Sequence, residues 1–228
     1  MWVALVTVLG ASGADLAALD RLYAHRDEPR VFAQMEAVLA QPGGDPELLW
    51  RAARAHCAKA RAAARVVDQQ ASARTCWALA DQARTANPNE AEGHYWAAVG
   101  VGLWAETIGV FRCLNEGVEG KLRERIDKAI ALDPTIERGG PWLFKARFLH
   151  QSPWPIRDMT RAGQLYEQVL ARFPENLVAR LHRADWLWEQ GERQRAREEY
   201  GAIIAADLAA DAPEGRAAVA EAARRLLR

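Results

Sequence analysis

The sequence has no surplus of charge of either sign, because lysine plus arginine and aspartate plus glutamate both number 30 in 228 residues. Without a basic field the chain has no electrostatic means of holding a nucleic acid, and without an acidic field it does not attract cationic partners. Half of the residues are hydrophobic. A chain of this length and composition is expected to bury a substantial core.

Runs of β-branched residues are scarce, and no segment alternates apolar and polar residues in the way a half-buried strand does. Alanine and arginine are abundant instead. Both residue types favour helices over strands. The sequence therefore predicts an all-α protein.

Cysteine is also scarce, with Cys57, Cys76 and Cys113 widely spaced along the chain. A disulfide framework uses an even number of cysteines, and a zinc site needs closely spaced pairs. We expect these three residues to be small buried side chains at helix contacts. If the protein is exported, one pair can be oxidised, and the sequence does not say which.

No apolar run is long enough to cross a bilayer. The longest, "MWVALVTVLGASGA" at residues 1–14, has Ser12 and Ala14 placed like a cleavage site but lacks a basic start. It is read either as a signal peptide or as an apolar segment covering the first helix, and export is the favoured alternative. Residues 15–228 are expected to form a single helical-repeat domain.

Prolines and tryptophans recur with a common period. Successive landmarks lie 46 residues apart at Pro42, Pro88 and Pro134, and again at Trp50, Trp96 and Trp142. Each proline follows an amphipathic stretch and cannot continue a helix interior, so it separates two helices. The interval holds two helices and a connection, which is typical of helical hairpins that stack into a solenoid.

The repeated unit resembles the tetratricopeptide repeat. Its first helix carries a large residue, a small residue four later and a large one three further on; its second carries a small residue, an aromatic four later and a terminal proline. The predicted repeat core is Trp50, Trp96, Gly100, Trp142, Ala146, Ala162, Tyr166, Ala184, Ala196 and Tyr200. The resemblance implies a right-handed solenoid of about five hairpins, closed by a helix near residues 214–228.

A narrower resemblance covers residues 92–204. The segments "HYWAAVGVG", "IDKAIALDPTIERGGPW" and "PWPIRDMTRAGQLYEQVLARFPENLVARLHRADWLWEQG" are similar to the T component of tripartite ATP-independent periplasmic (TRAP) transporters. The resemblance implies a bacterial, periplasmic, non-enzymatic adaptor that docks a solute-binding protein, with a small ligand in a groove or pore. The alternative is a cytoplasmic or periplasmic assembly scaffold without a small-molecule ligand.

Two departures from this family are visible. The chain has no lipid-anchoring cysteine near its start, and it has "PIRD" in place of a glycine-rich turn. A eukaryotic microtubule-associated family has a similar "HYW…IDKAI…DP" run. That part of the sequence therefore does not distinguish the two families.

Catalytic and metal-binding patterns are missing. None of the five histidines forms an i, i+4 pair around a glutamate, and no serine or cysteine has a nucleophile elbow around it. The "VGVG" at residues 99–102 lies within a helical pattern, where Gly100 is the small residue of the repeat. We therefore expect no enzymatic activity, no cofactor and no metal.

Five of the six candidate contacts for a ligand or partner are on one helix or in one insertion. His94, Val101 and Trp104 are expected near the concave side of the repeat, with a purely structural role as the alternative for His94. The insertion "SPWPIRD" is expected on the binding face, because insertions in repeat proteins gather there. Its Trp154 either contacts a partner or packs as a lid over the helix of Trp142, and Asp158 is expected to cap the next helix. The remaining candidate contacts are Arg157 and Trp188.

Overall fold

The computed structural model describes residues 16–206 and 213–227, and within these ranges it contains twelve helices and no strand. Consecutive helices pack as pairs, so the predicted all-α class is confirmed. The chain divides into two compact units, Met1–Arg125 and Ile126–Arg228, and the division falls inside the seventh helix. Residues 1–14, the predicted signal peptide or apolar segment, lie outside the described residues.

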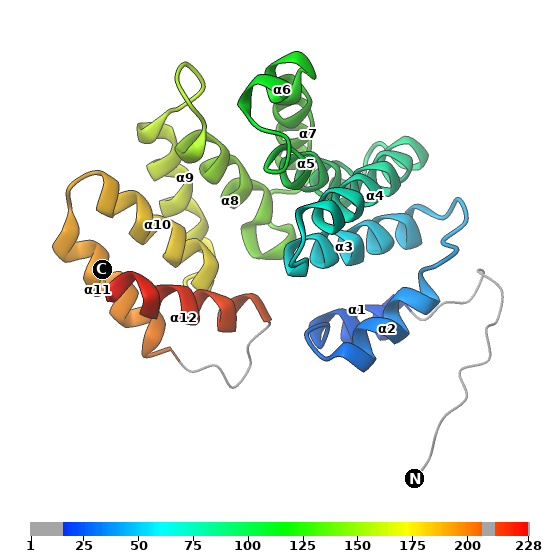
Figure 1. Ribbon diagram of the computed structural model, residues 1–228, viewed down its shortest axis with the longest axis horizontal. Coiled ribbons are helices and arrows are strands. Elements are labelled where there is room, and N and C mark those ends of the chain that lie inside the picture. The colour runs from blue at the N-terminus through cyan, green and yellow to red at the C-terminus, as the bar shows by residue number, and fades with distance from the viewer. Residues whose placement is uncertain (1–15, 207–212, 228) are drawn as a thin grey trace, which may run out of the picture. The chain divides into compact units, whose positions relative to one another are not determined.

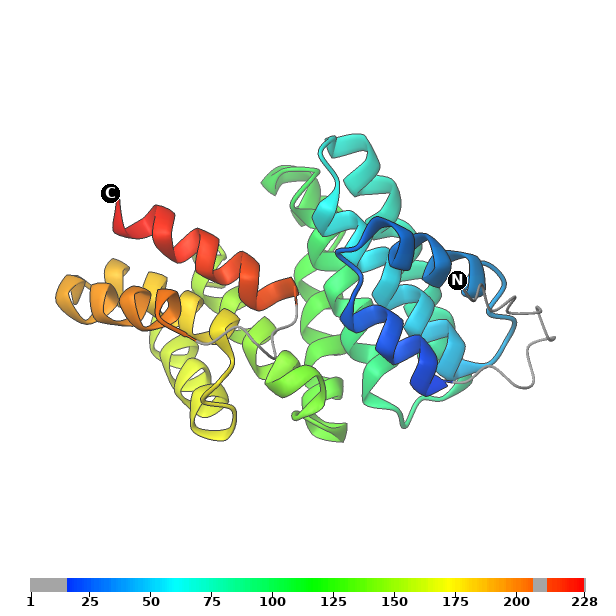
Figure 2. The same cartoon turned by 90° about the horizontal axis from the view of Figure 1, so that it is seen from below.

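The first unit is built around three long helices that lie side by side (Figure 1). The short pair α1–α2 lies along α3, as both views show (Figures 1 and 2). Its helices are α1 (Leu16–Ala24), α2 (Pro29–Val38), α3 (Pro46–Ala62), α4 (Val66–Ala86), α5 (Ala91–Ala105), α6 (Val110–Asn115) and the first part of α7 (Val118–Leu132).

A disulfide joins α3 to α4. Cys57 and Cys76 are bonded, with their Cα atoms 5.3 Å apart, and both are fully buried. Cys113 is a half-buried free thiol whose Sγ donates to the carbonyl oxygen of Ala105 at 3.6 Å. Two of the three cysteines are thus cross-linked and not merely packed, which the cysteine spacing did not reveal.

Helices α4 and α5 approach each other closely because glycines lie at their contact. A Cβ atom added to Gly100 would lie 2.7 Å from the backbone nitrogen of Trp77, and one added to Gly93 would lie 2.8 Å from that of Arg84. No side chain fits at such distances. The glycine that the repeat pattern singled out is therefore required by backbone contact between two helices.

The second unit contains the end of α7 and five further helices in consecutive contact. They are α8 (Ile136–Gln151), α9 (Met159–Arg172), α10 (Leu177–Glu189), α11 (Arg193–Ile204) and α12 (Pro213–Leu226). Its core has one cluster between α8 and α9, around Tyr166, and another among α10, α11 and α12, around Tyr200. The closing helix predicted near residues 214–228 is α12, which packs against α10 and α11.

The chain turns sharply at the start of α8. Glu137, Arg138 and Gly139 have left-handed backbones, with φ of 48°, 54° and 83°, so regular helix begins only after them. The turn therefore includes Gly139 and the two residues before it. The side-chain nitrogen of Asn176 donates to the carbonyl oxygen of Arg138 at 2.9 Å and holds the turn in place.

The predicted repeat-core residues lie at helix contacts in both units. Trp142 is half-buried. The other nine are buried: Trp50, Trp96, Gly100, Ala146, Ala162, Tyr166, Ala184, Ala196 and Tyr200.

Candidate functional site

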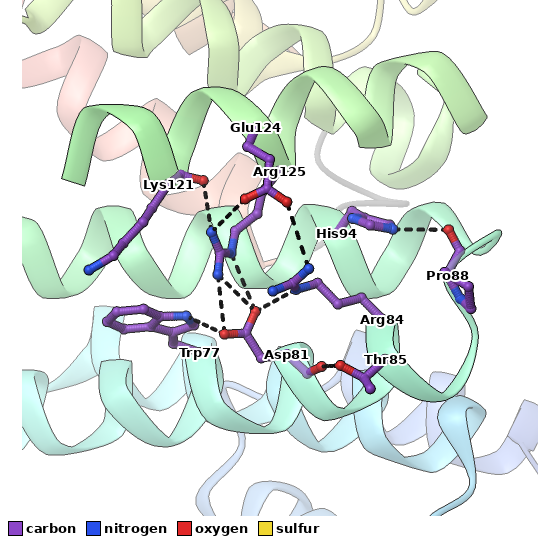
Figure 3. Close-up of polar contacts among 9 residues, drawn as sticks. All are labelled: Trp77, Asp81, Arg84, Thr85, Pro88, His94, Lys121, Glu124 and Arg125. Carbon is purple, nitrogen blue, oxygen red and sulfur yellow. Dashed lines mark hydrogen bonds and ion pairs between the residues drawn. The ribbon is translucent and has the colours of Figure 1, made fainter. Parts of the chain in front are cut away.

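A cluster of polar and aromatic side chains links α4 to the first part of α7 (Figure 3). We call it the Asp81 network, and its members are Trp77, Asp81, Arg84, Lys121, Glu124 and Arg125.

Asp81 is the centre of this network. Its Oδ2 accepts a hydrogen bond from Trp77 Nε1 at 2.7 Å, and its Oδ1 accepts one from Arg84 Nε at 2.6 Å. Arg125 Nη2 lies 3.2 Å from both carboxylate oxygens. Because the Arg125 side chain is buried, its charge must be compensated within the protein, and Asp81 supplies that compensation.

The aromatic side of the network carries two cations, the exposed Arg74 and the half-buried Lys121. The Trp77 and Trp104 rings lie 5.6 Å apart between centroids. Lys121 Nζ lies 5.4 Å from the Trp77 ring, and the guanidinium of the exposed Arg74 lies 5.7 Å from the Trp104 ring. Tryptophan flanked by basic groups is a composition common at protein-binding hot spots.

A second charged cluster fastens α1 to α3. Arg51 Nη2 lies 2.8 Å from Asp20 Oδ2, and Arg54 pairs with the other oxygen of Asp20. Arg51 also stacks 4.0 Å above the Trp50 ring. Partial burial raises the pKa of Asp20, but the hydrogen bonds and charges of the two arginines outweigh it, so the net shift is downward. These ion pairs hold α1 against α3.

Glu90, at the start of α5, is a carboxyl group with a strongly raised pKa. Burial, then the hydrogen bond to Glu47 and the negative charges of Glu47 and Glu92, raise the pKa of Glu90 to about 7. The pKa of Glu47 is lowered, because hydrogen bonding and charge from Arg51 outweigh the effect of its own burial. Below about pH 7 the two carboxyl groups therefore carry one negative charge between them.

Three of the predicted contacts are on α5 and are buried: His94, Val101 and Trp104. His94 Nε2 lies 3.1 Å from the carbonyl oxygen of Pro88, where the imidazole fixes the loop before α5 (Figure 3). Trp104 joins the aromatic side of the Asp81 network. All three side chains are enclosed by neighbouring helices. Their expected place near the concave side and their contact role stay predictions.

The other three predicted contacts are in the second unit. Trp154 is 88% exposed in the loop between α8 and α9, so the expectation of a lid over the Trp142 helix is wrong. Arg157 of the same loop pairs with Glu189, the neighbour of Trp188. Asp158 Oδ1 accepts from Arg161 N at 2.8 Å, which confirms the predicted helix cap.

Trp188 lies beneath two cations of the following helix. Arg193 and Arg197 are 5.5 Å and 5.9 Å from its ring centroid. The ion pair between Arg157 and Glu189 links the loop to the end of α10 that carries the Trp188 ring. Whether these residues contact a partner stays a prediction.

No group of three histidine, cysteine, aspartate or glutamate side chains within residues 16–206 and 213–227 is placed to hold a metal ion. No helix among the described residues is both long and apolar enough to cross a membrane.

Comparison with curated protein sequences gave no match to this chain. Residues 15–138 match the family described as regulator of microtubule dynamics protein 1-3, a eukaryotic family with a tetratricopeptide-like helical domain. These residues include all seven helices of α1 to α7 and the complete Asp81 network.

This match corrects the narrower resemblance drawn from the sequence. The assignments to the TRAP T component, to a bacterial adaptor of a solute-binding protein and to the periplasm are wrong, because the family matched is eukaryotic and microtubule-associated. The "HYW…IDKAI…DP" run, which did not distinguish two families, lies inside the matched region. Since the match extends over more than half of the sequence, the chain belongs to the family of regulator of microtubule dynamics proteins 1-3.

Proposed function

We propose that the chain is a non-enzymatic protein that regulates microtubule dynamics by binding a protein partner. The observation that carries this proposal is the family match over residues 15–138. The proteins of that family are regulatory and are not known enzymes. The Asp81 network supports a binding role, because Asp81 is paired with Arg84 and Arg125 while Lys121 remains a cation beside the Trp77 ring.

We further propose that the helix pairs are tetratricopeptide-like repeats of one right-handed solenoid spanning residues 15–228. The common period of the prolines and tryptophans supports this. The close contact of Gly100 with α4 is of the kind that a small residue in such a repeat provides. The repeats number about five in this proposal.

The aromatic side of the Asp81 network is the proposed partner surface. Asp81 is neutralised by Arg84 and Arg125, so the free cationic character of the surface comes from Arg74 and Lys121. The rings of Trp77 and Trp104 lie directly beneath these cations. An acidic segment of a partner protein would be held by the two cations and would cover the half-buried Trp77 ring.

Co-sedimentation with polymerised tubulin tests the function. We expect the purified full chain to pellet with microtubules and to change their growth or shortening rates under light microscopy. If the chain stays in the supernatant at every tubulin concentration and the rates are unchanged, the proposed function is wrong.

A pair of charge reversals tests the surface separately. Arg74→Glu combined with Lys121→Glu should weaken co-sedimentation by about tenfold or more. The matched control, Arg61→Glu combined with Arg123→Glu, reverses two exposed cations of the same unit outside the network and should bind like wild type. Equal binding by both double variants would mean that the partner surface lies elsewhere, and it would not contradict the proposed function.

A further inference from the structure

A pocket of about 530 Å³ opens in the first unit among α2, α3 and α4. Much of its wall is apolar and comes from Leu39, Pro42, Ala52, Ala55 and Leu79. Three of these side chains, Leu39, Ala52 and Ala55, belong to the buried core between the α1–α2 pair and α3. Its volume lies in the range of small-molecule sites, and its wall is mainly apolar, as theirs are.

Two uncharged polar side chains also line the pocket. His56 lines the pocket from α3, is half-buried, and makes no hydrogen bond to any described residue. Thr75 lines it from α4 and donates its hydroxyl proton to the carbonyl oxygen of Ala71 at 3.1 Å. The imidazole therefore keeps an N–H donor and a nitrogen acceptor for a bound molecule, and the threonine keeps an acceptor.

The pocket carries no net charge that would select an ion. Its ionised lining residue, Glu36, pairs with Lys59 at 2.7 Å, so the two charges cancel at the rim. Burial, and then the positive charge of Lys59, lower the pKa of His56, which keeps the imidazole neutral at physiological pH. An ionised ligand would lose its hydration without gaining an opposite charge.

The disulfide fixes the polar side of the pocket. Cys57 follows His56 on α3, and Cys76 follows Thr75 on α4. The bond between the two cysteines therefore holds the helices together at the level of the two polar residues. A site whose polar groups are fixed before binding loses less conformational entropy when a ligand enters.

We propose that this pocket binds an uncharged, mainly apolar small molecule that accepts a hydrogen bond from His56. The proposal does not depend on the partner surface or on microtubule binding. The ligand class follows from the apolar wall, the cancelled charges at the rim and the unused imidazole donor.

The probe for this site is prodan, an uncharged naphthalene that carries one ketone and fluoresces strongly in apolar surroundings. We expect a saturable rise in fluorescence with one bound molecule per full-length chain. Thr75→Trp, which places an indole in the pocket, should weaken binding by about tenfold or more. Thr85→Trp is the matched control, because Thr85 is also exposed on α4 and makes the same bond, to the carbonyl oxygen of Asp81, but does not line the pocket.

A second variant tests the hydrogen bond. His56→Phe keeps an aromatic ring of similar size but lacks the donor, and should weaken prodan binding by about tenfold. In wild type, prodan should shift the imidazole NMR signals of His56 and leave those of His94 in place. Circular dichroism confirms that each variant is folded. Absence of saturable binding to wild type, or equal binding by folded Thr75→Trp and Thr85→Trp, would overturn the proposal.

Discussion

At the residue scale, Arg125 shows how a buried charge is tolerated in this helical protein. Its guanidinium lies 3.2 Å from both oxygens of Asp81, which also accepts from Trp77 and Arg84. Removing one partner of such a pair leaves the other charge buried and uncompensated. The network therefore depends on Asp81 far more than on its exposed members.

Asp81→Ala should lower the free energy of unfolding by about 3 kcal/mol, because Arg125 would be left buried without a counter-charge. Urea denaturation followed by circular dichroism measures this loss. Glu124→Ala is the control, since Glu124 belongs to the same network but its side chain is 62% exposed, and it should cost less than about 1 kcal/mol. Equal losses in the two variants would contradict the assignment of Asp81 as the centre.

The raised pKa of Glu90 predicts a pH dependence of stability. Because its pKa is about 7 in the folded protein and ordinarily 4.5, folded Glu90 keeps a proton between these values that the unfolded chain has lost. Raising the pH through this window removes that proton and destabilises the fold.

Glu90→Gln stays uncharged and should lack this loss of stability. Its melting temperature should exceed that of wild type on the order of 2–4 °C at about pH 8, and the two should agree more closely at about pH 5. Differential scanning calorimetry at both pH values provides the measurement. Glu106→Gln, which changes an exposed glutamate, is the control. If the melting temperatures of wild type and Glu90→Gln fell in parallel as the pH rises, this would be evidence against the shared charge of Glu47 and Glu90.

At the element scale, the contact between α4 and α5 leaves no room for a side chain. Gly100→Ala would place its Cβ 2.7 Å from the Trp77 backbone nitrogen and force the helices apart. We expect a loss of about 1–3 kcal/mol in the free energy of unfolding. Chemical denaturation of the purified variant measures it.

Gly120 supplies the matched control, because it is also a helical glycine but a Cβ atom there meets nothing within 4 Å. Gly120→Ala should stabilise the protein by about 0.5–1 kcal/mol, through its higher helix propensity. If both alanine variants changed stability in the same direction, the close approach of α4 and α5 would not be the reason for Gly100.

Helices were easier to predict than the site. The proline and tryptophan period placed Trp50, Trp96 and Trp142 on α3, α5 and α8, because helix termination is a local property of the chain. The Asp81 network was not predicted. Trp77 and Asp81 are one helical turn apart, but Arg125 follows Asp81 by 44 residues. No local sequence pattern predicts a pairing over that separation. The pocket and the disulfide depend on similar contacts between helices.

At the scale of the whole molecule, α7 belongs to both compact units. Residues up to Arg125 count with the first unit and residues from Ile126 with the second. Each half of α7 is only about two turns long, and helices of that length are marginal alone. We therefore expect the two units to unfold together, as one domain.

Gly163→Ala tests this expectation from the second unit, because its Cβ would lie 2.5 Å from Trp186 Cζ2. The variant should shift a single unfolding transition, with the calorimetric and van't Hoff enthalpies equal. Gly201→Ala, on α11, meets nothing within 4 Å and is the control. If Gly163→Ala split the transition, and amide exchange in α3 to α5 kept its protection, the single-domain proposal would be wrong.

The helical-repeat architecture does not by itself identify the family of this chain. Within the run from His94 to Pro134, Trp96 belongs to the repeat core and Gly100 lies at the contact between α4 and α5. Such residues report a helical-repeat architecture, which many functions share. Only comparison over the longer stretch of residues 15–138 separated the two families.

The exposure of Trp154 gives the protein a natural optical probe. Among the described tryptophans it is the one that is exposed, and the other seven are buried or half-buried. With Trp2 replaced by phenylalanine, collisional quenching by iodide would act mainly on Trp154 emission. A molecule that binds to the loop between α8 and α9 would then reduce the quenching of Trp154, so its binding could be measured without an attached dye.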